Sequence, residues 1–154
     1  MITEMIPMWT SQRTLVSLRD VLQLFPPNNW RWTVEDFDGV FGRSPTGITW
    51  AQFRERVATG AVAFDWNGIQ QFADGVDQMI DGRIVATDES GTTVVQLDAF
   101  DSTEYEIVID PAWSGAAAFV AAVPGGWGLG ADSGLMLLTG IGVAPAVPGN
   151  GEGP

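Results

Sequence analysis

Residues 83–110 read RIVATDESGTTVVQLDAFDSTEYEIVID and hold three apolar stretches, at about 83–88, 92–100 and 104–110. The tripeptide Glu-Ser-Gly separates the first two, and a glycine that closes a three-residue loop is typical of a β-hairpin. In the third stretch apolar residues alternate with polar ones, which is the period of a half-buried strand. The segment therefore predicts three antiparallel strands, with both glutamates of the third strand facing away from the core.

The sequence before this segment predicts one helix and one further strand. Residues 14–25, TLVSLRDVLQLF, place leucines at helical spacing, and a Pro-Pro pair ends the pattern. In WRWTVEDF, which begins at Trp30, apolar and polar residues alternate again, so this stretch predicts a strand. Asp38-Gly39 and the glycines and prolines that follow it predict a long loop.

Three more helices are expected from capping signals. Thr49 followed by Gln52 is a capping-box pattern that opens a short helix. A similar pattern opens residues 67–80, whose apolar residues fall on one helical stripe. An Asp-Pro pair precedes an alanine-rich stretch, and it predicts the first residues of a helix over 112–122.

These elements predict the α+β fold class. We expect an antiparallel sheet of about four to five strands, packed by two to three helices, in a single domain over residues 1–123. Residues 124–154 are rich in glycine and proline, and we expect this extension to be partly disordered. Its one apolar run, Leu135–Leu138, could form an edge strand.

Several residue types are missing, and their absence narrows the chemistry. The chain has no histidine and no cysteine, and all seven of its basic residues are arginine. Serine–histidine and cysteine–histidine catalysis, histidine-ligated zinc and lysine Schiff bases are therefore excluded. We expect no enzymatic activity, no cofactor and no metal.

Charge is distributed unevenly along the chain. Residues 1–60 hold six arginines and six acids, whereas residues 61–154 hold thirteen acids and only Arg83, which accounts for the net charge of −12. A field of one sign attracts a partner of the opposite sign and speeds its association. A solvated surface that favours solubility is the alternative explanation. Direct nucleic-acid binding is disfavoured, because contacts with phosphates need a basic patch.

The predicted helix over 67–80 suggests where a basic partner would bind. Two of its aspartates and Asp81, directly after it, recur at helical spacing, and like charges so placed repel one another. We expect this stripe to join the acids of the following hairpin in one negative face, with a tryptophan as an apolar anchor. The predicted partner-binding residues are Trp66, Asp74, Asp77, Asp81, Asp88 and Glu89.

A second hypothesis rests on Glu35, Asp36 and Asp38, which lie near the end of the predicted Trp-rich strand. Carboxylates at a strand end are a common site for a metal or for acid/base chemistry. Asp36 and Asp38 would then serve a metal-dependent hydrolase. The simpler interpretation is an Asp-Gly turn that closes the strand.

Two quoted segments carry a family resemblance: LRDVLQLFPPNNWRWTVEDFDGV, from residue 18, and FDWNGIQQFADGVDQMIDGRIVATD, from residue 64. Over roughly residues 14–110 the chain resembles small cytoplasmic α+β proteins of GC-rich bacteria that are grouped with the immunity proteins of polymorphic toxin systems. The resemblance implies a protein that binds and blocks a toxin domain.

The leading hypothesis is therefore a non-enzymatic acidic binding protein that neutralises a basic protein partner, such as a nuclease-type toxin domain. The alternatives are a carboxylate- or metal-dependent hydrolase, and a phage-associated accessory protein that mimics nucleic acid. No stretch approaches a membrane span and no secretory signal is evident, so we expect a cytoplasmic protein without membrane contact.

Overall fold

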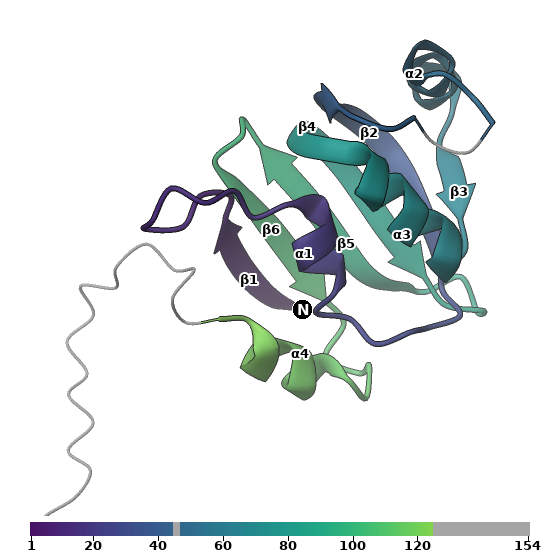
Figure 1. The fold of residues 1–154 in the computed structure, drawn as a ribbon. Coiled ribbons are helices and arrows are strands. Elements are labelled where there is room, and N and C mark those ends of the chain that lie inside the picture. Colours follow the sequence, from purple (N-terminus) through teal and green to yellow (C-terminus); the bar gives the residue numbers. More distant parts are fainter. Residues whose placement is uncertain (45–46, 125–154) are drawn as a thin grey trace, which may run out of the picture.

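The computed structural model describes residues 1–44 and 47–124, and it confirms the α+β class (Figure 1). The described part of the chain holds six strands and four helices, slightly more of each than expected. The strands are β1 (Ile2–Pro7), β2 (Arg31–Phe41), β3 (Val62–Phe64), β4 (Val76–Thr87), β5 (Thr93–Phe100) and β6 (Glu104–Ile109). The helices are α1 (Leu18–Leu22), α2 (Trp50–Thr59), α3 (Trp66–Gly75) and α4 (Ala116–Ala122).

All six strands form one antiparallel sheet in the order β1-β6-β5-β4-β2-β3. The three strands predicted from residues 83–110 are confirmed as the meander β4–β5–β6, in which β4 begins earlier than expected. The two edge strands, β1 and β3, lie in stretches to which we had assigned no structure. The first and the third strand of the chain therefore close the sheet on its two sides.

Helices α1 and α3 lie on the same face of the sheet (Figure 1). The buried apolar side chains of the described residues form one cluster between these helices and the sheet. Strand alternation supplies the sheet side of this cluster: the side chains of Tyr105, Ile107 and Ile109 are buried, whereas both glutamates of β6 face away. Burial of these side chains is the main favourable term in folding. None of the described helices is long and apolar enough to cross a membrane.

Two helices begin at capping boxes. Thr49 accepts a hydrogen bond from the backbone N–H of Gln52, whose side chain accepts one from the backbone N–H of Thr49, as the sequence predicted. Ser17 and Asp20 do the same for α1. Helix α1 is shorter than the predicted 14–25 at both ends, since Ser17 caps its N-terminus and Gln23 its C-terminus.

The predicted helix over 67–80 is wrong at its C-terminal end. Helix α3 stops at Gly75, and Val76 is already extended and paired with Phe41 of β2. Gly75 lies so close to the carbonyl oxygen of Arg43 that a Cβ there would be 2.1 Å from it. Glycine disfavours a helix, and the β-branched residues that follow fit the pleated sheet better. The sequence 76–80 therefore belongs to the sheet.

Two other expectations also need correction. Strand β2 continues through Asp38 and Gly39 to Phe41, where we had predicted a loop, because it pairs with the early part of β4. Helix α4 starts at Ala116 and not at 112, and Asp110 instead accepts a hydrogen bond from the N–H of Ala112 in a preceding turn. The expected edge strand at 135–138 lies outside the described residues.

Candidate functional site: the open face of the sheet

The sheet face turned away from α1 and α3, here called the open face, carries a row of side chains across five strands, here called the charged row because four of its five residues are charged. Each residue of this row is the register partner of the next one. In order across the sheet the row consists of Asp36, Arg83, Asp98, Glu106 and Met5. Side chains of directly paired residues lie about 4.5–5.5 Å apart at Cβ, so these groups act on one another.

A second row lies nearer the turn between β5 and β6. Asp38 of β2 pairs with Asp81 of β4, and Phe100 of β5 pairs with Glu104 of β6, which pairs with Pro7. Like charges in directly opposed positions destabilise a sheet. This row therefore adds three carboxylates to the open face and no base.

A third row lies on the side of the charged row that is away from the β5–β6 turn, and it is uncharged. Its members, again register partners from strand to strand, are Thr33, Val85, Gln96, Val108 and Thr3. The acids of the open face are thus gathered toward one end of the sheet, and this end is where the β5–β6 turn lies.

An irregularity in β2 brings one more carboxylate into this region. The register moves from Val34↔Ile84 to Asp36↔Arg83, so Glu35 is an extra residue that opposes no partner. Regular strand alternation would place Glu35 on the face opposite Asp36 and Asp38. The bulge instead lets Glu35 line the same hollow as Asp36.

Arg83 and Asp98 form an ion pair at the centre of the charged row. Nε of Arg83 donates to Oδ1 of Asp98 at 2.6 Å, and a second guanidinium nitrogen lies 3.3 Å from Oδ2. The amide of Gln96 also donates to Oδ2, at 2.6 Å. The hydrogen bond and the charge of Asp98 raise the pKa of the Arg83 guanidinium, and Glu35 and Glu106 add to the effect. The single base of this region is therefore already occupied.

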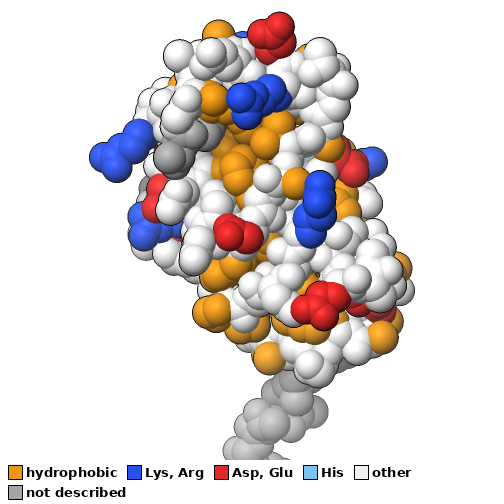
Figure 2. Space-filling view, turned by 90° about the vertical axis from the view of Figure 1, so that its right-hand side faces the viewer, with side chains coloured by type: hydrophobic (Ala, Val, Ile, Leu, Met, Phe, Trp, Pro, Cys, Tyr) orange, Lys and Arg blue, Asp and Glu red, His pale blue; other side chains and the backbone are white. Residues whose placement is uncertain are grey.

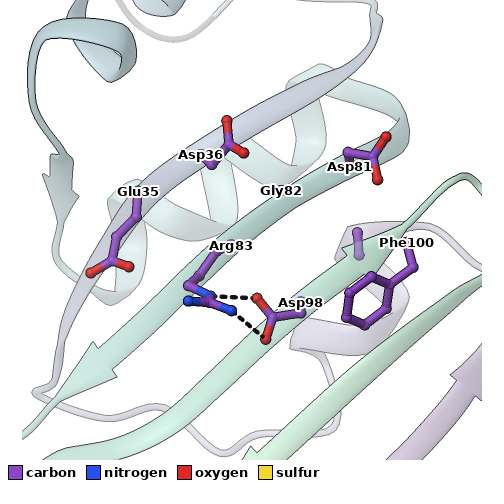
Figure 3. Close-up of a pocket in the computed structure, with 8 residues that line it drawn as sticks. Glu35, Asp36, Asp81, Gly82, Arg83, Asp98 and Phe100 are labelled. Carbon is purple, nitrogen blue, oxygen red and sulfur yellow. Dashed lines mark hydrogen bonds and ion pairs between the residues drawn. The ribbon is translucent and has the colours of Figure 1, made fainter.

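A hollow of about 440 Å³ opens beside this pair (Figure 3). In Figure 3 the labelled side chains lie on the near side of the strands and the helices lie behind them. The hollow is lined by Glu35, Asp36, Asp81, Gly82, Arg83, Asp98, Ala99 and Phe100. Asp81 accepts a hydrogen bond from the backbone N–H of Asp101 at 2.9 Å. The lining thus combines carboxylates with an aromatic ring, which together suit a cation.

The side of the molecule at the β3 edge has a different character. Figure 2 shows that arginines and acids are interspersed on it, with apolar atoms between them. Arg54 lies over the ring of Phe41, with its guanidinium carbon 4.7 Å from the ring centre. Charges of mixed sign partly cancel one another, so the open face is the better candidate for attracting a charged partner.

The predicted aspartate stripe is not one surface, because it is not on one helix. Asp74 belongs to α3 and forms an exposed ion pair with Arg19 of α1 at 3.1 Å. Asp77 is in β4, at an irregularity where β2 and β4 shift register. Only Asp81 of the three lies in the hollow of the open face.

The hairpin acids lie at the far end of β4. Asp88 is seven residues beyond Asp81, which corresponds to roughly 23 Å along a strand. The hydroxyl of Ser90 and the backbone N–H of Thr92 donate to Asp88 and lower its pKa. Glu89 accepts a hydrogen bond from Asn29 at 2.6 Å. Asp88 therefore holds the turn of the hairpin and Glu89 links the turn to Asn29, and their contact with a partner remains a prediction.

Trp66 packs against the core. Its ring centre lies 5.8 Å from that of Trp32, which is fully buried, and Trp66 itself is only partly exposed. A side chain in this position contributes to stability through its packing. The role of partner anchor for Trp66 remains a prediction.

Asp36 and Asp38 do not converge on one cavity. Asp36 lines the hollow and Asp38 does not, although both belong to the open face. Among residues 1–44 and 47–124 no three acidic side chains come together in a way that could hold a metal ion. The geometry of this part of the chain therefore offers no specific support for a metal-dependent hydrolase.

Sequence reasoning missed Arg83, Asp98 and Phe100 as parts of a site. The alternation in β4–β6 could have placed the first two on one face, but only the register makes them partners.

Comparison of the chain with protein-family models, with curated proteins and with solved structures finds no match.

Proposed function

We propose that this chain is a non-enzymatic binding protein that neutralises a basic protein partner, and that the partner is a toxin domain for which it provides immunity. The observation that carries the proposal is the composition of the open face. Glu35, Asp36 and Asp81 line the hollow, Asp38 and Glu104 lie in the row of Asp81, and the nearby base, Arg83, is paired with Asp98. A negative surface that its own arginine does not neutralise is suited to an external cation.

Blocking would work by occlusion. A nuclease-type toxin binds phosphates with arginine and lysine side chains. Carboxylates held on a sheet can pair with those same side chains, and a bidentate contact with arginine is the strongest form of such a pair. The toxin would then be unable to reach its substrate, and the inhibitor would need no chemistry of its own.

The charge of the open face predicts how the complex forms. Surface charges mainly raise the rate of association, and salt screens them beyond about 8 Å at physiological ionic strength. Association should therefore slow as salt is added. Apolar contacts, which salt does not screen, should set the rate of dissociation.

The test is to co-express the protein with the product of the neighbouring gene, to purify the complex and to measure association at several salt concentrations. The double variant Asp36→Asn with Asp81→Asn should slow association at least tenfold, and it should reduce the protection of cells that express the toxin. A matched control, Glu55→Gln with Glu4→Gln, removes the same charge outside the open face, because Glu55 is on α2 and Glu4 pairs with the core-facing Ile107. If both double variants behave alike, or if no basic partner co-purifies, the proposal is wrong.

A further inference from the structure

Large apolar side chains are exposed at one corner of the open face. Met5, Trp9 and Phe100 have 42%, 47% and 43% of their surface exposed, and few other large apolar residues in the described chain are as open. Met5 and Phe100 flank β6 on its two sides, through their pairing with Glu106 and Glu104. Exposed aromatic and methionine side chains are enriched in protein–protein interfaces. This apolar corner directly adjoins the acidic hollow, which Phe100 also lines.

The apolar corner is held in place by hydrogen bonds. The indole Nε1 of Trp9 donates to the carbonyl oxygen of Ser102 at 3.2 Å. On the other side, Ser102 donates its backbone N–H to Ile80, and Asp101 donates its own to Asp81. The β5–β6 turn is therefore tied both to β4 and to the segment after β1. A surface fixed in this way loses little conformational entropy when a partner binds.

We infer that the apolar corner and the acidic hollow together form the docking surface for a basic protein. An apolar side chain of the partner covers Met5, Trp9 and Phe100, and a neighbouring arginine or lysine enters the hollow. There its cation meets the carboxylates of Asp36 and Asp81 and the ring of Phe100. This inference rests on the proposed function, and it names the part of the surface and the chemistry of the contact.

Charge complementarity favours this occupant over two others. A second copy of the chain would bring the same carboxylates, at Asp36, Asp38 and Asp81, against one another, and like charges at an interface oppose association. A nucleic acid would meet the same repulsion from its phosphates. A protein surface with arginine or lysine beside an apolar side chain matches both halves of the docking surface.

Two synthetic peptides of equal length and equal positive charge serve as probes. One has leucines between its arginines and the other has glycines. The leucine peptide should bind roughly tenfold more tightly, because it alone can cover the apolar corner. In two-dimensional NMR spectra, the resonances that shift should be those of Phe100, Arg83, Asp36 and the indole of Trp9.

Variants separate the two halves of the surface. Phe100→Ala should remove most of the preference for the leucine peptide and leave the salt dependence unchanged. Phe100→Leu should restore part of the apolar contact. Asp36→Asn with Asp81→Asn should weaken both peptides alike and flatten the salt dependence. Val40→Ala, an exposed apolar residue on β2, is the matched control for Phe100→Ala and should change nothing.

Three results would overturn the inference. The two peptides could bind equally, the shifts could gather at Asp74 and Asp88, or the protein could self-associate through Phe100. The proposed function fails separately. If the peptides bind as expected but no toxin is blocked, the docking surface is supported and the proposed immunity function is wrong. If a toxin is blocked and Phe100→Ala has no effect on that complex, the role stands and the docking surface is wrong.

Discussion

Arg83 and Asp98 face each other across β4 and β5, but the protein shields them very differently from water. The Nε–Oδ1 distance is 2.6 Å, and 49% of the Arg83 side chain is exposed against only 7% of the Asp98 side chain. A nearly buried carboxylate is costly unless it is paired and hydrogen-bonded. The half-exposed arginine therefore allows Asp98 to occupy the centre of the open face.

Replacement of Arg83 by methionine should destabilise the protein by about 1–3 kcal/mol, because Asp98 loses its ionic partner and keeps only the Gln96 amide. The measurement is the free energy of unfolding in urea. Arg31→Met, at an exposed position of the same sheet, is the matched control and should change this quantity by less than about 0.5 kcal/mol. Equal effects of the two substitutions would show that the ion pair contributes no stability.

Asp38→Asn should stabilise the protein, by about 0.2–1 kcal/mol, because Asp38 directly opposes Asp81. The asparagine can still accept the hydrogen bond from the N–H of Gly39, which lies 2.9 Å from Oδ1 of Asp38. The gain should shrink as salt is added, since both groups are exposed. Glu55→Gln on α2 is the control, and a gain that is independent of salt would contradict the explanation.

Gly82→Ala should destabilise the protein by about 1–3 kcal/mol. Gly82 has a φ of +149°, and a Cβ there would lie 2.5 Å from the carbonyl oxygen of Asp36 and 2.8 Å from Cε of Met79. The methionine can move, but the backbone of β2 cannot without loss of pairing. Gly60→Ala, where nothing lies within 4 Å, is the control in the same thermal unfolding experiment. If Gly82→Ala unfolds at the same temperature as Gly60→Ala, the backbone of β2 can move away from the new Cβ without a loss of stability, and the explanation is wrong.

The central meander could be predicted because its signals are local. Alternation and turn residues within 83–110 define the last part of β4 and all of β5 and β6 without reference to the rest of the chain. The edge strands could not be predicted in the same way. Strand β3 has three residues, and β1 pairs with a strand more than a hundred residues away, as in Ile2↔Ile109. Pairing at such a distance leaves no trace in local sequence spacing.

The acidity of the site was visible in the sequence, but its position was not. The aspartate stripe Asp74, Asp77 and Asp81 assumed one continuous helix, but α3 ends at Gly75 and Val76 already pairs with Phe41 of β2. The bulge at Glu35 then reverses the expected direction of its side chain. Both events depend on contacts between β2 and its neighbours, which charge counts do not contain.

Tyr105 makes the stability of the protein sensitive to alkaline pH. It is the only tyrosine of the chain, its side chain is fully buried, and its hydroxyl donates to the carbonyl oxygen of Val16 at 3.3 Å. Burial raises its pKa well above the ordinary value of 10.0, and the charge of Asp20 adds to the shift. The folded protein therefore keeps the phenol protonated at pH values where the unfolded chain ionises.

Above pH ~10 the unfolded state binds fewer protons than the folded state, so the free energy of unfolding should fall by about 1.4 kcal/mol per pH unit. Below that pH Tyr105 is protonated in both states, so it does not make the free energy of unfolding depend on pH. The chain has no lysine and no cysteine, and arginine stays charged, so no other side chain titrates here.

Urea unfolding of the wild type and of Tyr105→Phe at increasing pH checks this prediction. The variant loses the hydrogen bond to Val16, but its stability should not change with pH in this range. If it loses stability as steeply as the wild type, Tyr105 is not the group responsible.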